Sequence, residues 1–213
     1  MFLTFEGVDS SGKTTQARTA ADARRAGTGR PVHFIREPGG TPISERLRAI
    51  LLDRTNLELS DHAELLLFSA SRAQLVRQVI LPALHRGESV VCDRYMDSTT
   101  AYQGYGRGLD LAAVAEINRF ATAGVDPDLT ILVDITVDEI ERRKRAAGTG
   151  YDRMESAGKE FYERVRQGYL AIAGANPGRC VVVNGMRSIE EIALDIGAVV
   201  RERDESKNRH GRR

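Results

Sequence analysis

The chain has 213 residues, which is enough for one α/β domain with a full hydrophobic core. Charged residues make up 29% of it and the formal net charge is +1, so the composition gives no indication of a nucleic-acid or membrane partner. There is no signal-peptide pattern, no apolar run near the ~18 residues of a membrane span, and no metal-site spacing at Cys92 and Cys180, so we expect a protein of the reducing cytoplasm.

Short apolar, β-rich runs alternate with longer helical patterns along the chain. The expected strands are Phe2–Glu6, Val32–Arg36, Ser89–Asp93, Leu129–Asp134 and Cys180–Asn184. The expected helices are Lys13–Ala26, Pro42–Leu52, Asp61–Arg86, Leu111–Ala123, Val137–Ala147, Ala157–Gly174 and Ile189–Arg203. Pro82 should kink or end the third of these helices, because proline cannot donate the helical hydrogen bond.

The alternation of strands and helices predicts the fold class. Continuous apolar strands are typical of parallel strands covered on both faces. We therefore predict a three-layer α/β/α fold around a five-stranded parallel sheet, with right-handed crossovers. One domain is expected over residues 1–205, with a flexible basic tail over residues 206–213.

A glycine-rich turn follows the first strand and precedes the first helix. Gly7, Gly12, Lys13 and Thr14 fit the pattern G-x-x-x-x-G-K-[ST] of a phosphate-binding loop. In such loops backbone N–H groups face the phosphates, the lysine contacts the β- and γ-phosphates, and the hydroxyl binds Mg²⁺. The sequence therefore predicts ATP binding by Gly7, Val8, Asp9, Ser10, Ser11, Gly12, Lys13, Thr14 and Thr15.

The third strand ends in the pair Asp93–Arg94. Asp93 is placed to hold Mg²⁺ directly or through water, and the Arg94 guanidinium is suited to a phosphate. Ligands of open α/β sheets bind at this carboxyl edge. A structural ion pair between the two residues is the alternative.

Further candidates for the site of the phosphate acceptor lie directly after the second expected strand and on the third expected helix. Glu37 belongs to the rigid turn "REPGGTP", and Phe68 and Arg72 are four residues apart on one helical face. A stacking ring and a guanidinium donor suit a pyrimidine base, although a residue such as Phe68, taken alone, is more often part of the core than a platform for a base. The segment "DSTTAYQGYGRG" supplies further hydroxyl and amide groups, or is an ordinary loop.

Taken together, these segments resemble the bacterial thymidylate kinase family over essentially the whole chain. The resemblance is carried by "FEGVDSSGKTT", "REPGGTP", "LLFSASRAQ", "CDRYMDSTTAYQGYGRG", "PDLTILVDI" and "YDRMES", in the family's order and spacing. It implies a Mg²⁺-dependent transfer of the γ-phosphoryl group of ATP to dTMP, giving dTDP for dTTP synthesis. It also implies a homodimer. The helices Asp61–Arg86 and Leu111–Ala123 could form the contact between subunits, but burial within one chain explains their apolar stripes equally well.

The resemblance assigns a role to individual residues around the acceptor phosphate. Arg94 and Arg48 would hold the phosphate of dTMP. Glu37 would lie near the 3′-hydroxyl and the phosphates, and Asp9 would touch the gap between donor and acceptor or its Mg²⁺. The metal would thus be held by Thr14, Asp93 and Asp9.

It assigns other residues to the nucleoside. Phe68 would stack on thymine, and Arg72 would donate a hydrogen bond to its O4. Tyr102 would crowd the 2′ position of the sugar and disfavour ribonucleotides. The base pocket would also be lined by Ser98, Thr99 and Gln103.

A basic stretch, residues 142–155, is the expected lid over ATP. Positions 8–11 of the phosphate loop contain no basic residue, so the chain resembles the branch of the family whose lid supplies an arginine. Arg153, in the D-R-x-E pattern, is the expected catalytic arginine, beside Lys13, Arg94 and Asp9. The other lid candidates, which could equally be a solvated face of i, i+4 ion pairs, are Arg142, Arg143, Lys144 and Arg145.

Two other functions share part of this pattern. A pyrimidine nucleoside monophosphate kinase that prefers dUMP or CMP would carry the same phosphate loop and arginines. A GTPase switch would also carry the loop, but it usually has an N-K-x-D run after a strand, which this sequence lacks.

Overall fold

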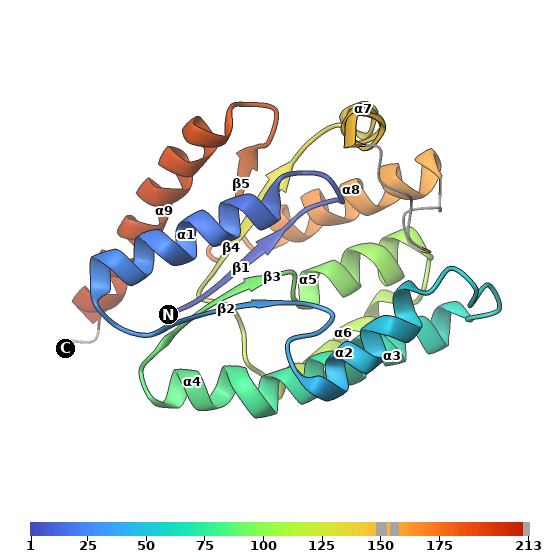
Figure 1. Cartoon of the computed structure of the whole chain (residues 1–213), viewed down its shortest axis with the longest axis horizontal. Helices are drawn as coiled ribbons and strands as arrows, with labels where there is room; N and C mark the ends of the chain where they lie inside the picture. Colours follow the sequence, from blue (N-terminus) through green and yellow to red (C-terminus); the bar gives the residue numbers. More distant parts are fainter. Residues whose placement is uncertain (148–152, 154–157, 211–213) are drawn as a thin grey trace.

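The computed structural model describes residues 1–147, 153 and 158–210. Its strands are β1 (Phe2–Glu6), β2 (Val32–Arg36), β3 (Ser89–Asp93), β4 (Leu129–Asp134) and β5 (Cys180–Asn184). They form one parallel sheet in the order β2-β3-β1-β4-β5 (Figure 1). The five predicted strands and the predicted fold class are therefore confirmed.

Helices cover both faces of this sheet. They are α1 (Lys13–Thr28), α2 (Pro42–Leu52), α3 (Asp61–Leu75), α4 (Leu81–His85), α5 (Met96–Thr99), α6 (Leu111–Thr122), α7 (Val137–Ala147), α8 (Lys159–Ala175) and α9 (Ile189–His210). Two π-helical segments, η1 (Val76–Ile80) and η2 (Thr100–Gly106), continue α3 and α5. In the described part of the chain no helix combines the length and apolar character that a membrane span needs.

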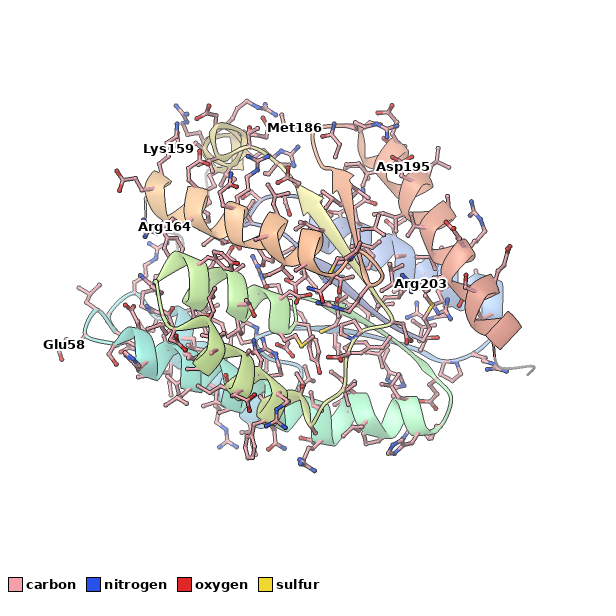
Figure 2. All side chains as sticks on the ribbon, turned by 180° about the vertical axis from the view of Figure 1, so that it is seen from behind. Glu58, Lys159, Arg164, Met186, Asp195 and Arg203 are labelled. Atoms are coloured by element: carbon pink, nitrogen blue, oxygen red, sulfur yellow. The ribbon has the colours of Figure 1, made fainter. Side chains whose placement is uncertain are left out.

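Side chains of alternate strand residues build the core on the two faces. Leu3 and Phe5 of β1 pack in one cluster with apolar residues of α1 and α9. Phe2 belongs to a cluster on the opposite face, with residues of α3, η1 and α4. Figure 2, seen from behind, shows α8 with Lys159 and Arg164 in front of the sheet and α1 behind it. One layer therefore consists of α1 and α9, the middle layer is the sheet, and the remaining large helices form the third layer on the opposite face.

The position of β1 between β3 and β4 decides where a ligand can bind. The register places Phe5 beside Asp93, and Glu6 beside Leu132. The loop after β1 therefore begins next to the carboxyl ends of both neighbours. This is the reversal point of strand order at which open α/β sheets bind ligands.

Three helical segments differ from the sequence prediction. The expected helix Asp61–Arg86 is α3, η1 and α4 in succession. The π-helical turn ends two residues before Pro82, whose missing N–H and bulky ring disturb α-helical bonding. α5 and η2 were not predicted as helix. α9 continues beyond Arg203 to His210, into the segment expected to be a tail. Residues 211–213 of the expected tail, half of the expected lid (148–152 and 154–155) and residues 156–157 lie outside the described residues.

Candidate active site

The phosphate loop has a backbone that only glycine fits at two positions. Gly7 has φ +140°, and a Cβ atom built on it would lie 2.5 Å from the carbonyl oxygen of Val133. Gly12 has φ +90° and directly precedes the first residue of α1. Because the helix N-terminus presents unpaired N–H groups and a positive dipole end, this turn is suited to bind phosphates.

Lys13 and Thr14 open α1 at the floor of the loop. The Lys13 ammonium donates to the carbonyl oxygen of Val8 at 3.3 Å and lies 3.9 Å from a carboxylate oxygen of Asp9. Burial and the nearby Arg94 lower its pKa. A bound polyphosphate would act in the opposite direction and hold the ammonium in its charged form.

Thr14 and Asp93 form a pair that fits a divalent cation. The hydroxyl of Thr14 donates to Oδ2 of Asp93 at 2.5 Å. Oδ1 of Asp93 is buried and has no hydrogen-bond partner among the described residues. A hydroxyl and a free carboxylate oxygen beside a phosphate loop are the protein ligands that Mg²⁺ uses in such sites.

Arg94 joins the phosphate loop to the neighbouring cleft. Its Nη1 donates to the carbonyl oxygen of Gly7 at 3.0 Å, and its Nη2 pairs with Oδ1 of Asp9. The second oxygen of Asp9 accepts from the hydroxyls of Tyr102 at 2.9 Å and Tyr162 at 3.1 Å. Burial would raise the pKa of Asp9, but Arg94 and Lys13 outweigh it and lower the pKa well below its usual range. Arg94 is thus paired with Asp9 of the loop, while Asp93 accepts from Thr14.

A cleft of about 260 Å³ opens beside this ion pair. Its wall on the loop side includes Asp9, Lys13, Thr14 and Asp93. Every residue that the sequence analysis assigned to dTMP lines the same cleft: Glu37, Arg48, Phe68, Arg72, Arg94, Ser98, Thr99, Tyr102 and Gln103. Residues from α2, α3, α5 and η2 are therefore brought together at the edge where β1 and β3 end.

Arg72 is the most buried cation of the cleft, with 2% of its surface exposed. Its Nε and Nη2 contact Oε2 of Glu37 at 2.8 and 2.7 Å. Its other donors bind the hydroxyl of Thr99, the side-chain oxygen of Asn118 and the carbonyl oxygen of Tyr95. Four hydrogen bonds and the ion-pair contact of Nη2 with Glu37 therefore occupy the guanidinium, so a base that binds Arg72 has to share or replace one of these partners.

Glu37 keeps one free acceptor in this arrangement. Its Oε1 is buried without a hydrogen-bond partner in the described structure. Burial raises the pKa of Glu37, although Arg72 acts against this. A ligand hydroxyl that donates to Oε1 would satisfy the buried oxygen.

The comparisons with known proteins agree with this site. The family model described as thymidylate kinase matches residues 5–196, which include the phosphate loop, Arg94 and the whole cleft. The chain belongs to the thymidylate kinase family. It is 45% identical to the thymidylate kinase of Geobacter sp. (strain M21), over 99% of this chain and 95% of that protein. It is 47% identical to the thymidylate kinase of Deinococcus radiodurans, over 95% of this chain and 97% of that protein.

A solved member of the family has the same fold. The crystal structure of thymidylate kinase from Ehrlichia chaffeensis superposes with a TM-score of 0.76 at 36% sequence identity. The match covers 94% of this chain and 98% of that one. The similarity therefore extends over the entire α/β domain, not over the phosphate loop alone.

In this member of the thymidylate kinase family, Arg153 lies on the acceptor side of the site. Its Nη2 is 2.6 Å from Oε2 of Glu64, and its Nε donates to the carbonyl oxygen of Leu51 at 2.9 Å. Glu64 is fully buried and also accepts from Gln103 and Arg107. Neither Glu64 nor Leu51 belongs to the phosphate loop.

Two other lid candidates do contact the phosphate loop or its partners. Nη1 of Arg143 donates to the carbonyl oxygens of Ser10 and Ser11 at 3.2 and 3.1 Å. The ammonium of Lys144 donates at 3.0 Å to the hydroxyl of Tyr162, which in turn donates to Asp9.

The remaining two lid candidates form ion pairs on their own helix. Arg142 pairs with Glu139, and Arg145 with Glu141. The structure therefore separates two solvated lid cations, Arg142 and Arg145, from Arg143, which contacts the loop, and from Lys144, which is linked to it through Tyr162.

Several side chains of the site were not found from the sequence. They are Glu6, Glu64, Asn118, Tyr162 and Tyr169, all of which bind an expected site residue. Tyr162 and Tyr169 are seven residues apart, so they lie on one face of α8, and this spacing was the available signal.

Proposed function

We propose that this chain transfers the γ-phosphoryl group of ATP to dTMP, yielding ADP and dTDP. The observation that carries the proposal is the contact of Arg94 with both Gly7 and Asp9, which joins the acceptor cleft to the phosphate loop. Two anionic groups bound on either side of this contact would meet with their phosphates adjacent. Phosphoryl transfer depends mainly on such positioning and on electrostatic stabilisation.

ATP binds through the loop Gly7–Thr15 in this proposal. Backbone N–H groups and the N-terminus of α1 hold its phosphates, and Lys13 exchanges the carbonyl oxygen of Val8 for the β- and γ-phosphates. Thr14 and Asp93 would hold Mg²⁺, with Asp9 next to them. When bound there, the ion would supply positive charge beside the phosphates of ATP.

The cleft holds dTMP with its phosphate toward Arg94 and Arg48. Arg48 already donates to the carbonyl oxygen of Pro38, at the edge of the cleft. Phe68 supplies a ring for the base, and the free Oε1 of Glu37 supplies an acceptor for the 3′-hydroxyl. Ser98, Thr99, Tyr102 and Gln103 complete the wall around base and sugar. An acceptor phosphate is already anionic, so no strong general base is required.

Arg153 is our proposed lid arginine. To stabilise the migrating phosphoryl group, its guanidinium has to exchange Glu64 for phosphate oxygens. Arg107 and Gln103 would continue to satisfy Glu64 after that exchange. Arg143 would keep its backbone contacts and shape the phosphate loop from outside.

We also propose that the protein acts as a homodimer in the cytoplasm. The dimer is supported by large apolar side chains exposed on two helices that contact each other, Leu66 on α3 and Phe120 on α6. The cytoplasm is supported by the two buried, unpaired cysteines, Cys92 and Cys180.

An acceptor panel tests the function. ADP release from ATP and Mg²⁺ is measured with dTMP, dUMP, UMP, CMP and AMP as acceptors. We expect the highest kcat/KM with dTMP, because the cleft offers a ring and buried donors that fit a deoxypyrimidine. A higher kcat/KM with dUMP, UMP, CMP or AMP would contradict the proposal.

A further inference from the structure

Glu6, the last residue of β1, lies buried directly beneath Arg94. Its Oε1 accepts from the backbone N–H of Tyr95 at 2.7 Å. Its Oε2 accepts from the hydroxyls of Ser98 at 2.6 Å and Tyr169 at 3.1 Å. Glu6 does not line the cleft, so it reaches a ligand only through other residues.

The two hydroxyls that bind Glu6 also bind Arg94. Nη1 of Arg94 donates to Ser98 and to Tyr169, each at 3.1 Å. A guanidinium can only donate, so both oxygens must accept from it and direct their single protons elsewhere. Glu6 receives those protons, directly or through the 2.8 Å contact between the two hydroxyls. The carboxylate thereby keeps oxygen lone pairs facing Arg94.

We propose that Glu6 is a positioning residue that aligns the Arg94 guanidinium for the acceptor phosphate by fixing the proton orientation of the Ser98 and Tyr169 hydroxyls. The inference rests on the proposed function, because it takes Arg94 as the group that binds the phosphate of dTMP. A carboxylate is required, since both of its oxygens accept. A glutamine amide of the same shape has only one acceptor oxygen. If its NH2 group faces the Tyr95 N–H, two donors oppose each other; if the NH2 group faces the hydroxyls, it competes with Arg94 for their oxygen lone pairs.

The test compares binding of dTMP and thymidine to Glu6→Gln and to the parent by titration calorimetry at pH 8. Thymidine has no phosphate and serves as the matched ligand. We expect Kd for dTMP to rise about tenfold and Kd for thymidine to stay within about twofold. Equal weakening of both ligands would mean a merely structural role, and unchanged Kd for dTMP would mean no role. Either result overturns the inference.

Asp134→Asn is the matched control. Asp134 ends the neighbouring strand β4 and accepts two bonds from Arg166 of α8 at 2.8 Å, so the same chemical change is made at a strand end that contacts the same helix. We expect Asp134→Asn to bind dTMP and thymidine with the same Kd as the parent. If Asp134→Asn raised Kd for dTMP as much as Glu6→Gln does, the effect would not be specific to the Arg94 network and the inference would fail.

Tyr169→Phe gives a second test should Glu6→Gln fail to fold. It removes one hydroxyl between Glu6 and Arg94 and leaves the ring that packs against Tyr102. Kd for dTMP is expected to rise about threefold to fivefold with thymidine unchanged, and parental dTMP affinity would overturn the inference. A parent protein that fails to bind dTMP would instead refute the proposed function itself.

Discussion

The hydroxyl of Thr14 donates to Oδ2 of Asp93 across 2.5 Å, and Oδ1 of the same carboxylate is buried without a partner in the described structure. The two residues come from the start of α1 and the end of β3, which the sheet register brings together. An unpaired buried carboxylate oxygen is costly unless something binds it. The pair is therefore the place where we propose that the cation accompanying ATP binds.

Asp93→Asn should weaken the response to magnesium. Replacing an anionic oxygen by an amide lowers cation affinity, so we expect the Mg²⁺ concentration for half-maximal rate to rise about tenfold or more, with Kd for dTMP unchanged. A Mg²⁺ titration of ADP release at saturating ATP and dTMP measures this. A parental Mg²⁺ dependence would exclude Asp93 from the cation site.

Gly7→Ala should destabilise the protein and prevent ATP binding. The new Cβ would lie 2.5 Å from the carbonyl oxygen of Val133, and φ of +140° disfavours any side chain. We expect a loss of on the order of 2–4 kcal/mol in the free energy of unfolding. Gly27→Ala is the control, because Gly27 lies in α1 with open space around it. Its free energy of unfolding should exceed that of the parent by about 0.5–1 kcal/mol. Urea unfolding measures both, and equal effects would refute the steric argument.

Arg153→Ala should lower kcat by about 10²–10³ and leave dTMP affinity nearly intact, since the interaction is made in the transition state. Single-turnover rates and dTMP titration separate the two effects. Arg119→Ala is the control, because Arg119 forms an exposed ion pair with Glu116 on α6. A parental rate for Arg153→Ala, together with a large loss for Arg143→Ala, would transfer the role to Arg143.

Stability should depend on pH through Glu6. Burial, and next the like charge of Asp97, raise the pKa of this carboxyl to about 7 from its usual 4.5. The other titratable groups near it are Lys13, Arg72, Cys92, Arg94, Tyr169 and Cys180. The folded protein thus binds the proton more tightly than the unfolded chain, so this contribution to stability is complete below about pH 4.5 and is lost as the pH rises to about 7.

Glu6→Gln removes that titration. The free energy of unfolding of the parent, relative to the variant, should fall by on the order of 2–3 kcal/mol between pH 5 and pH 7.5. Urea denaturation across this range provides the measurement. A difference between parent and variant that is constant with pH would show that the Glu6 carboxyl titrates at its ordinary value.

The sequence predicted the strands well for a physical reason. Buried parallel strands are continuous apolar runs, and each run here ends at a charged or polar residue or a glycine turn. The helix Met96–Gly106 was missed because its hydroxyls and glycines are typical of a loop. Those glycines serve close packing: a Cβ at Gly106 would lie 2.7 Å from the Phe161 ring of α8.

The cleft's lining was predictable but its internal pairing was not. Motifs indicated the residues around dTMP, and the structure brings them to one cavity. Glu64 binds Gln103, Arg107 and Arg153 because the fold brings these three residues, distant from it in sequence, to one side of α3. No spacing in the sequence contains that information, so the present position of Arg153 could be found only from the structure.

The most direct test of the central claim is product analysis by chromatography. Purified protein is given dTMP, ATP and Mg²⁺, and dTDP is quantified against time for the parent and Arg94→Ala. The account predicts stoichiometric formation of dTDP and ADP by the parent, and kcat/KM for dTMP reduced by about 10³ or more in Arg94→Ala. ATP consumption without dTDP, or equal dTDP formation by both proteins, would contradict it.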